Sequence, residues 1–432
     1  MIYLVAYLLI LFAITFAVSH KETSEDFLIG GRNRAAWQVL LTKFAGTIGI
    51  GWFISYTGFA YVYGTSLFAA LSGMIFGSLL FSLWAAPRIQ KHAHEFKFYT
   101  QGDFVYHNTQ SVFSKILVNS VSNIMQFLFL LISVVGGAKL ISHFGFMPYA
   151  AAVATTSAAI AIYISLAGYK AVVMTDIFQS VIIISLLAFL TFTLLRSENI
   201  NSLLASKTLK PDLPTIIGFW VYGIFGIFSG ADAYQLCYAA KNRRATVAGL
   251  SLAMIPIMIT GVFLLFVGLY MFTRAPGLDP DMIFMEAVMK HLPQVVVPLG
   301  VVLFFAGLMS SADTQVYAIA SHLVLSTKTD QPVRKIRFTI VALLLVTAVI
   351  ALVFRNIIGL TILGAAITLS LSVGMIYVVA GGKSADRFSG SVLGGLAAMG
   401  IGIAVFGLNP QIIGMVILGS LLGLLFKRSI PR

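Results

Sequence analysis

Long apolar runs follow one another along most of the chain, and they constrain its fold more than any other feature. Each run of about 20 residues is long enough to cross a bilayer as a helix, and none shows the alternating polarity of a membrane β-strand. Backbone polar groups in such runs must be satisfied within the segment, as they are in a helix. We therefore predict an all-α integral membrane protein with about 13 transmembrane helices, at residues 2–19, 36–62, 65–86, 113–141, 147–167, 172–195, 214–238, 246–272, 294–325, 337–354, 357–380, 389–407 and 410–426.

The composition excludes the soluble classes of protein. Of the 432 residues 59% are hydrophobic and 10% are charged, whereas a soluble chain carries about 25% charged residues. The single cysteine, Cys237, excludes an intramolecular disulfide and a cysteine-based metal site. The sequence contains no HExxH, GxSxG or Walker motif. We therefore expect neither an enzyme nor ATP-driven transport by this chain.

The basic residues predict an orientation. The net charge of +13 is explained by cytoplasmic loops that follow the positive-inside rule, so we expect a lipid bilayer and no nucleic acid as partner. The first run lacks a basic leader and a small-residue cleavage site before His20, which indicates a retained helix. With the N-terminus outside, twenty Lys and Arg residues fall on the inside and seven on the outside, and Lys43 lies within a helix. We expect a multi-pass protein of the cell (plasma or inner) membrane with its N-terminus outside and its C-terminus cytoplasmic.

Two spans that lie five helices apart are interrupted by glycines. With the leading helix set aside, core helix 1 contains the glycine-rich segment 45–51 and core helix 6 the segment 223–230. Glycine weakens a helix, and paired interruptions in two halves indicate a 5+5 inverted-repeat transporter with ion and solute sites at the breaks. Close packing of helices at the glycines is the alternative, but for the matched pair we favour discontinuous core helices 1 and 6.

This interpretation divides one membrane domain into four consecutive segments. They are a leading helix with its loop (1–34), a first five-helix repeat (35–196), a second repeat (213–381) and two trailing helices with a basic C-terminus (388–432).

Charged residues inside spans are costly in a membrane and therefore indicate function. In core helix 8, Ser310, Asp313 and Thr314 follow an i, i+3, i+4 spacing, so one helix face offers oxygen ligands to a hard monovalent cation. The hydroxyls can instead bond to carbonyls of their own helix, although this leaves the aspartate unexplained. Asp176, near the start of core helix 5, either shares the ion cage or is favoured there by the helix dipole.

Core helix 3 carries a polar stripe that is a candidate wall of a solute cavity. Asn119, Ser122, Asn123 and Gln126 repeat at helical spacing, and they either face a solute or join helices to one another. Further hydroxyl groups that are candidates for the same cavity lie in core helix 10, at Thr361, Thr368, Ser370 and Ser372.

The remaining candidates lie near the two breaks. Lys43 either snorkels to the membrane interface or pairs with an acid such as Asp176. Asp232 is either a solute contact or a structural ion partner, and Trp52 is either a solute contact or gate, or packs as an interfacial aromatic residue. The glycines expected to border the solute are Gly49, Gly51 and Gly230.

Several segments carry motifs of a known membrane-protein family. The segment 27–32 resembles the pattern F-L-x-G-G/A-R, and 45–49 resembles A-T-x-I-S with Gly49 in place of the serine. The segment 167–179 is similar to G-G-x-x-A-V-x-x-T-D-x-x-Q, and 308–314 resembles L-M-S-S-x-D-S. By these motifs, which are spread over most of the chain, the sequence resembles the sodium:solute symporters, a family with a leucine-transporter-type core.

The resemblance implies a sodium-coupled symporter that takes up a small polar organic solute by alternating access, with sodium as the coupling ion. Carried over residue by residue, it implies a sodium site formed by the carbonyls of Ala45, Ile48 and Gly307 and the hydroxyls of Ser310 and Ser311. A second sodium site found in some members maps to Asp176, Ser310, Asp313 and Thr314.

Two alternatives stay open at this point. One is a proton-coupled or exchange transporter of the same fold, and the other is a membrane sensor that binds solute without moving it. The sequence does not indicate the oligomeric state or which solute is carried.

Overall fold

The computed structural model describes residues 2–19, 24–166, 168–195, 213–291, 293–325 and 331–426, and within these ranges its regular structure is helical. The α-helices are α1 (Ile2–Ser19), α2 (Ser24–Ile29), α3 (Ala36–Thr47), α4 (Thr57–Tyr63), α5 (Leu67–Leu80), α6 (Ala86–Phe96), α7 (Gln101–Thr109), α8 (Val112–His143), α9 (Tyr149–Leu166), α10 (Tyr169–Leu195), α12 (Leu213–Phe225), α13 (Ala231–Ala239), α14 (Arg243–Arg274), α15 (Ile283–His291), α16 (Val297–Leu325), α17 (Pro332–Val353), α18 (Ile357–Val379), α19 (Ala385–Phe406) and α20 (Ile412–Gly423).

The helices have the length and apolar character of membrane spans. Within the described ranges ten helical stretches are long and apolar enough to cross a membrane, and two shorter apolar helices cover Tyr3–Val18 and Ile412–Gly423. Large apolar side chains on α17, such as Phe338 and Val353, are 76% and 75% exposed, as expected of a surface that faces lipid. The all-α multi-pass prediction is confirmed, whereas the count of 13 spans, the four segment boundaries and the orientation stay predictions.

Core helix 1 is broken as the glycines predict. Helix α3 ends at Thr47, and Ile48 leaves the helical region with φ −86° and ψ 75°. The chain becomes helical again at Ile50 and continues through a π-helical turn, Trp52–Tyr56, into α4. The two halves of core helix 1 are therefore separate rods joined at Ile48 and Gly49.

Core helix 6 is interrupted in the same way. Helix α12 ends at Phe225, a 3-10 turn covers Gly226–Phe228, and α13 begins at Ala231 after an extended Gly230. Both predicted discontinuities are confirmed. Close packing is also present in this helix, because a Cβ on Gly223 would lie 2.5 Å from the carbonyl oxygen of Ala70 on α5.

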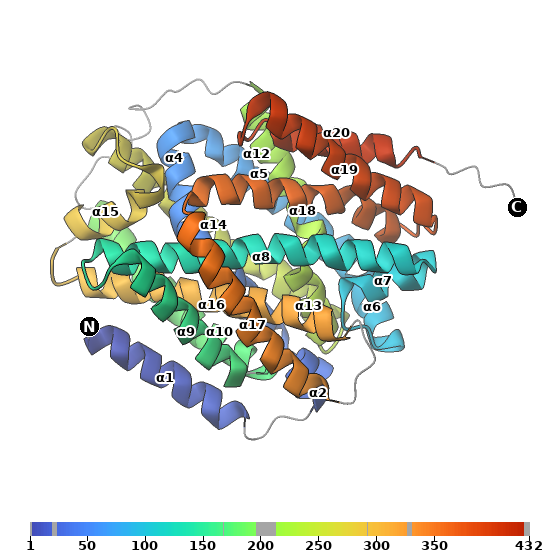
Figure 1. Ribbon diagram of the computed structural model, residues 1–432, viewed down its shortest axis with the longest axis horizontal. Helices are drawn as coiled ribbons and strands as arrows, with labels where there is room; N and C mark the ends of the chain where they lie inside the picture. The colour runs from blue at the N-terminus through green and yellow to red at the C-terminus, as the bar shows by residue number, and fades with distance from the viewer. Residues whose placement is uncertain are drawn as a thin grey trace, which may run out of the picture.

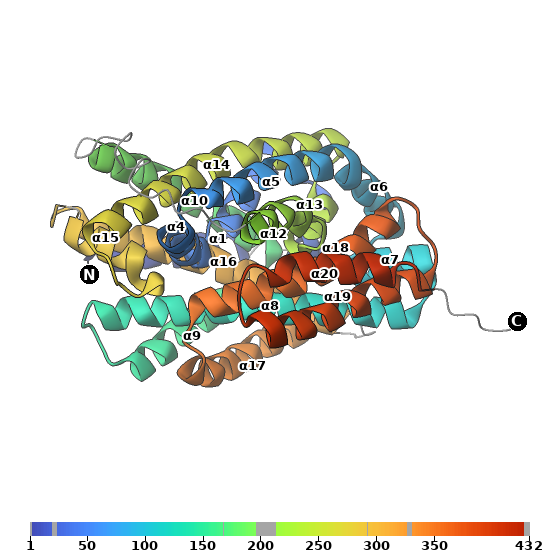
Figure 2. The same cartoon turned by 90° about the horizontal axis from the view of Figure 1, so that it is seen from above.

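The helices form two groups that face each other across the breaks. Helix α14 packs on α3, α4 and α5, and α12 packs on α5, whereas α8 packs on α9 and α16, and α17 packs on α8, α9 and α16. Figure 1 shows α8 running across the molecule with α17 crossing in front of it, and Figure 2 shows α14 and α5 on the side opposite α17. Helices α3 and α16 meet between the groups, which places the break of core helix 1 against core helix 8.

A short backbone bridge ties the beginning of core helix 1 to the end of core helix 6. The N–H of Arg34 donates to the carbonyl of Ala239 at 2.9 Å, and the N–H of Lys241 donates to the carbonyl of Arg34 at 2.9 Å. These bonds form an isolated parallel bridge between Arg34 and Ala240. The Arg32 guanidinium, in the preceding turn, donates to the Ala93 carbonyl on α6. The N-terminal end of α3 and the C-terminal end of α13 are therefore held together by main-chain hydrogen bonds.

Candidate ion and solute sites

Helix α16 lies in direct contact with the break of core helix 1, and glycines allow the approach. A Cβ on Gly49 would lie 1.5 Å from Ser311 Oγ and 3.2 Å from the carbonyl oxygen of Gly307. A Cβ on Gly307 would lie 3.3 Å from the carbonyl oxygen of Ile48. The glycine that replaces the expected serine at position 49 is thus explained, because a side chain there would overlap Ser311.

The break frees a carbonyl for a cation. In an unbroken helix the N–H of Gly49 would bond to the carbonyl of Ala45, but it donates to the carbonyl of Thr47 instead, at 3.1 Å. Ala45, Ile48 and Ser310 are fully buried and Ser311 is 4% exposed. The structure thus brings Ile48, Gly307 and Ser311 together, with Ala45 and Ser310 in the adjoining turns of the same two helices.

Two acids are buried next to this contact. Asp176 on α10 and Asp313 on α16 are both fully buried. Ser310 Oγ donates to Asp176 Oδ1 at 2.7 Å, and Tyr163 Oη donates to Asp313 Oδ2 at 3.0 Å. Thr314 Oγ1 lies 3.4 Å from Asp313 Oδ1. The candidate residues of the second ion site therefore form one connected cluster, and Tyr163 is a member that the sequence did not indicate.

The position of Asp176 rules out the helix-dipole interpretation. Helix α10 begins at Tyr169, so Asp176 lies beyond the first turn, to which the helix dipole effect is confined. Its Oδ2 atom is buried without a hydrogen-bond partner. A buried carboxylate oxygen needs a partner, and a cation would supply one.

The donor set fits sodium. Carboxylate, hydroxyl and carbonyl oxygens are ligands for hard cations. Among the described residues no cluster of three or more His, Cys, Asp or Glu side chains could hold a metal. The site is thus a group of oxygen ligands, here called the oxygen cage, where the end of α3 contacts α16.

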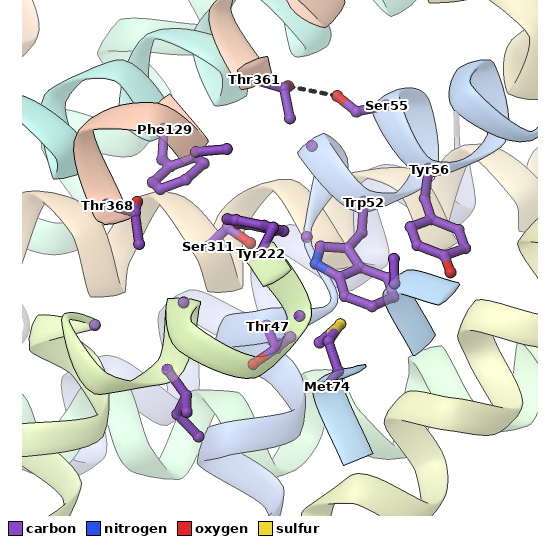
Figure 3. Close-up of a pocket in the computed structure, with 18 of the residues that line it drawn as sticks. Thr47, Trp52, Ser55, Tyr56, Met74, Phe129, Tyr222, Ser311, Thr361 and Thr368 are labelled. Carbon is purple, nitrogen blue, oxygen red and sulfur yellow. Dashed lines mark hydrogen bonds between the residues drawn. The ribbon is translucent and has the colours of Figure 1, made fainter. Parts of the chain in front are cut away.

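A cavity of about 260 Å³ opens beside the two breaks. Figure 3 shows Trp52, Tyr222 and Ser311 arranged around it. The Trp52 ring stacks on Tyr56, with centroids 4.8 Å apart and planes at 4°. The predicted solute residues that line the cavity are Gly49, Gly51, Trp52, Gln126, Gly230 and Asp232. That these residues bind solute stays a prediction.

Helix α18, which is core helix 10, contributes part of the cavity wall. Thr361 and Thr368 line it, and Thr361 Oγ1 lies 2.6 Å from Ser55 Oγ, a bond drawn in Figure 3. Ser370 and Ser372 instead donate to carbonyls of their own helix. Ser55 was not expected in the site, since a single serine in an apolar span gives no distinct signal.

Two of the predicted solute contacts join helices to one another in this structure. Asn119 accepts a hydrogen bond from the N–H of Gly102 at the start of α7, at 2.9 Å. Asn123 Oδ1 lies 3.1 Å from Nδ1 of His322 on α16. Neither asparagine lines the cavity. The polar stripe of α8 runs past the end of the cavity, and only Gln126 reaches it.

Lys43 forms an ion pair, although not with the acid named as an example. Its Nζ lies 2.6 Å from Asp232 Oδ2, and the two side chains are 12% and 24% exposed. Snorkelling to the interface is therefore wrong for Lys43, because its ammonium group is paired with Asp232 and both residues line the cavity.

The chain matches known transporters over most of its length. A model of the sodium:solute symporter family matches residues 27–354. The sodium/pantothenate symporter of Haemophilus influenzae is 23% identical over 342 residues, which cover 74% of this chain and 70% of that protein. The sodium/pantothenate symporter of Escherichia coli is 25% identical over 282 residues, 59% of this chain and 57% of that protein.

Solved structures share the fold. A Na⁺-coupled sialic acid symporter in a substrate-bound outward-open state superposes with a TM-score of 0.79 at 16% identity, covering 98% of this chain and 97% of the other. A nucleobase-cation-symport-1 family transporter in a closed conformation gives a TM-score of 0.64 at 11% identity, covering 93% and 94%. The oxygen cage at the helix break and the adjoining cavity agree with an ion-coupled transporter. Because the family model covers most of the chain, the chain belongs to the sodium:solute symporter family.

Proposed function

We propose that this symporter binds sodium at the break of core helix 1 and uses it to drive uptake of a small polar organic solute by alternating access. The coupling ion would bind to the carbonyls of Ala45, Ile48 and Gly307 and the hydroxyls of Ser310 and Ser311. A second ion would bind to Asp176, Ser310, Asp313 and Thr314. The solute would occupy the cavity beside both sites, and the N-terminus would lie outside the cell.

One observation carries this proposal: Asp176 Oδ2 is buried without a hydrogen-bond partner, although Oδ1 of the same carboxylate is bonded to Ser310, a residue of the proposed cage. Ser310 belongs to both proposed sites, and its hydroxyl already contacts Asp176. A bound cation would stabilise the contact between the break and α16, which belong to different helix groups. Its release would weaken that contact and allow the groups to move.

The test compares the thermal stability of the purified protein in NaCl and in KCl at equal ionic strength. A ligand that binds only the folded state at about 100 times its Kd adds about 2.7 kcal/mol of stability, so we expect a higher Tm in sodium. The variant with Ser310→Ala and Ser311→Ala should lose this sodium-specific increase. Equal Tm values in both salts for the unmodified protein would contradict sodium binding and favour proton coupling or exchange.

Transport is tested in proteoliposomes with an inward sodium gradient. Uptake of the solute should stop when potassium replaces sodium, and it should not respond to a pH gradient alone. Uptake at the same rate without sodium would overturn the coupling.

A further inference from the structure

The solute cavity contains an ion pair that joins the two broken helices. Lys43 comes from α3, before the break of core helix 1, and Asp232 comes from the first turn of α13, after the break of core helix 6. Among the described residues that line the cavity, these two are the charged ones. The cavity therefore offers one positive and one negative group, 2.6 Å apart, and is neutral overall.

The ion cage has its own countercharge. Asp176 and Asp313 lie outside the cavity and are fully buried in the cage. Sodium can be compensated by these two carboxylates, so the solute does not need to carry a negative charge to balance it. The charge of the solute is then decided by the Lys43–Asp232 pair.

A solute with a single charge would fit this pair poorly. A carboxylate that binds Lys43 would separate it from Asp232 and leave that acid without its partner. An ammonium group that binds Asp232 would do the same to Lys43. An unpaired charge in a partly buried site is costly. A zwitterion replaces both contacts at once, because its carboxylate takes Lys43 Nζ and its ammonium takes Asp232 Oδ2.

The rest of the cavity wall is mainly apolar and aromatic. The stacked rings of Trp52 and Tyr56 form one part of it, and Met74, Phe219 and Ile257 form others. The volume of about 260 Å³ corresponds to about nine water molecules at ~30 Å³ each. Such a space suits a small solute with an apolar side chain, and it buries that side chain away from water.

Resting on the sodium symport proposed above, we propose that Lys43 and Asp232 are the specificity-determining residues of the cavity and that the solute is an α-amino acid with an apolar or aromatic side chain. The flexible stem of Lys43 allows its ammonium to move away from Asp232 as the solute enters between them.

The test measures binding of L-leucine, L-methionine and L-phenylalanine to the purified full-length protein in NaCl and in KCl. Each amino acid is compared with its decarboxylated amine and its N-acetyl derivative. In sodium, at least one amino acid should bind about tenfold or more tightly than both of its singly charged counterparts, because a site built for two polar groups rejects an analogue that lacks one.

Two variants test the assignment of each charge. Lys43→Met removes the partner of the carboxylate, so preference should change from the amino acid to its amine. Asp232→Asn removes the partner of the ammonium, so preference should change to the N-acetyl derivative. A merely structural ion pair would weaken binding of all three compounds alike. The matched control is Lys115→Met, which removes an ion pair of 2.9 Å with Asp103 away from the cavity and should keep the original preference.

The outcomes separate this inference from the proposed function. If sodium raises the Tm but none of the three amino acids binds better than its counterparts, the amino-acid assignment is overturned while sodium binding stands. If the two variants keep the original order of preference, the role of the ion pair is overturned. A Tm that does not respond to sodium would instead contradict the proposed function.

Discussion

The contact between Gly49 and Ser311 allows a quantitative test of the ion cage. In Gly49→Ala the new Cβ would lie 1.5 Å from Ser311 Oγ and 2.5 Å from Ser311 Cβ. Rotation of the hydroxyl can remove the first overlap but not the second. Carbon atoms pack at about 3.5–4.0 Å, so α16 must move away from the break by about 1 Å. Overpacking of this kind costs about 1–3 kcal/mol.

Thermal unfolding across a sodium titration measures both consequences of this substitution. We expect Gly49→Ala to lower the Tm in KCl and to raise the sodium concentration that gives half of the stabilisation. Adding Ser311→Gly removes both overlapping atoms. It should restore the Tm in KCl but not the response to sodium, because the hydroxyl proposed as a ligand is also lost. Gly400→Ala is the matched control, since a Cβ at Gly400 meets nothing within 4 Å.

The reasoning is refuted if Gly49→Ala keeps the Tm and the sodium response of the unmodified protein. Recovery of the sodium response in the variant that also carries Ser311→Gly would show that the Ser311 hydroxyl is not a ligand.

Three further substitutions or treatments have defined outcomes. Ser310→Ala removes the hydrogen bond to Asp176 Oδ1 and leaves that buried acid without its donor, so the Tm without sodium should fall by the equivalent of about 1–3 kcal/mol; an unchanged Tm would contradict the contact. Lys139→Met leaves Asp281, which also accepts the N–H of Ile357, without its ion pair of 2.6 Å, and should destabilise the protein by up to about 3 kcal/mol in thermal unfolding. Cys237 is fully buried, so a maleimide should label it only as the protein unfolds, and rapid labelling of the native protein would place it at an accessible surface.

The helical fold could be predicted from the sequence because a membrane leaves few alternatives. The length of the apolar runs predicts the spans, and the glycines of 45–51 and 223–230 predict both interruptions. The cluster around Asp313 was also predictable, since three of its oxygen-bearing side chains lie within five residues of one helix. The spacing of residues within one helix directly predicts which side chains share a face.

Contacts between distant segments could not be predicted in the same way. Lys43 and Asp232 are 189 residues apart, and Tyr163 reaches Asp313 over 150 residues. Helical spacing says which face a residue occupies but not where along that face a cavity ends. For this reason the spacing could not show that Gln126 lines the cavity while Asn119 and Asn123 do not.

The bridge between Arg34 and Ala240 has a consequence for how the two broken helices can evolve and move. Its two hydrogen bonds use main-chain atoms, the N–H and carbonyl of Arg34 with the carbonyl of Ala239 and the N–H of Lys241. Almost any amino acid at these positions keeps such bonds, with proline as the exception because it has no N–H. The connection between α3 and α13 is therefore insensitive to amino-acid substitution at these positions. Substitutions in the cavity wall can therefore accumulate without loss of the main-chain bonds that hold the two half-helices together.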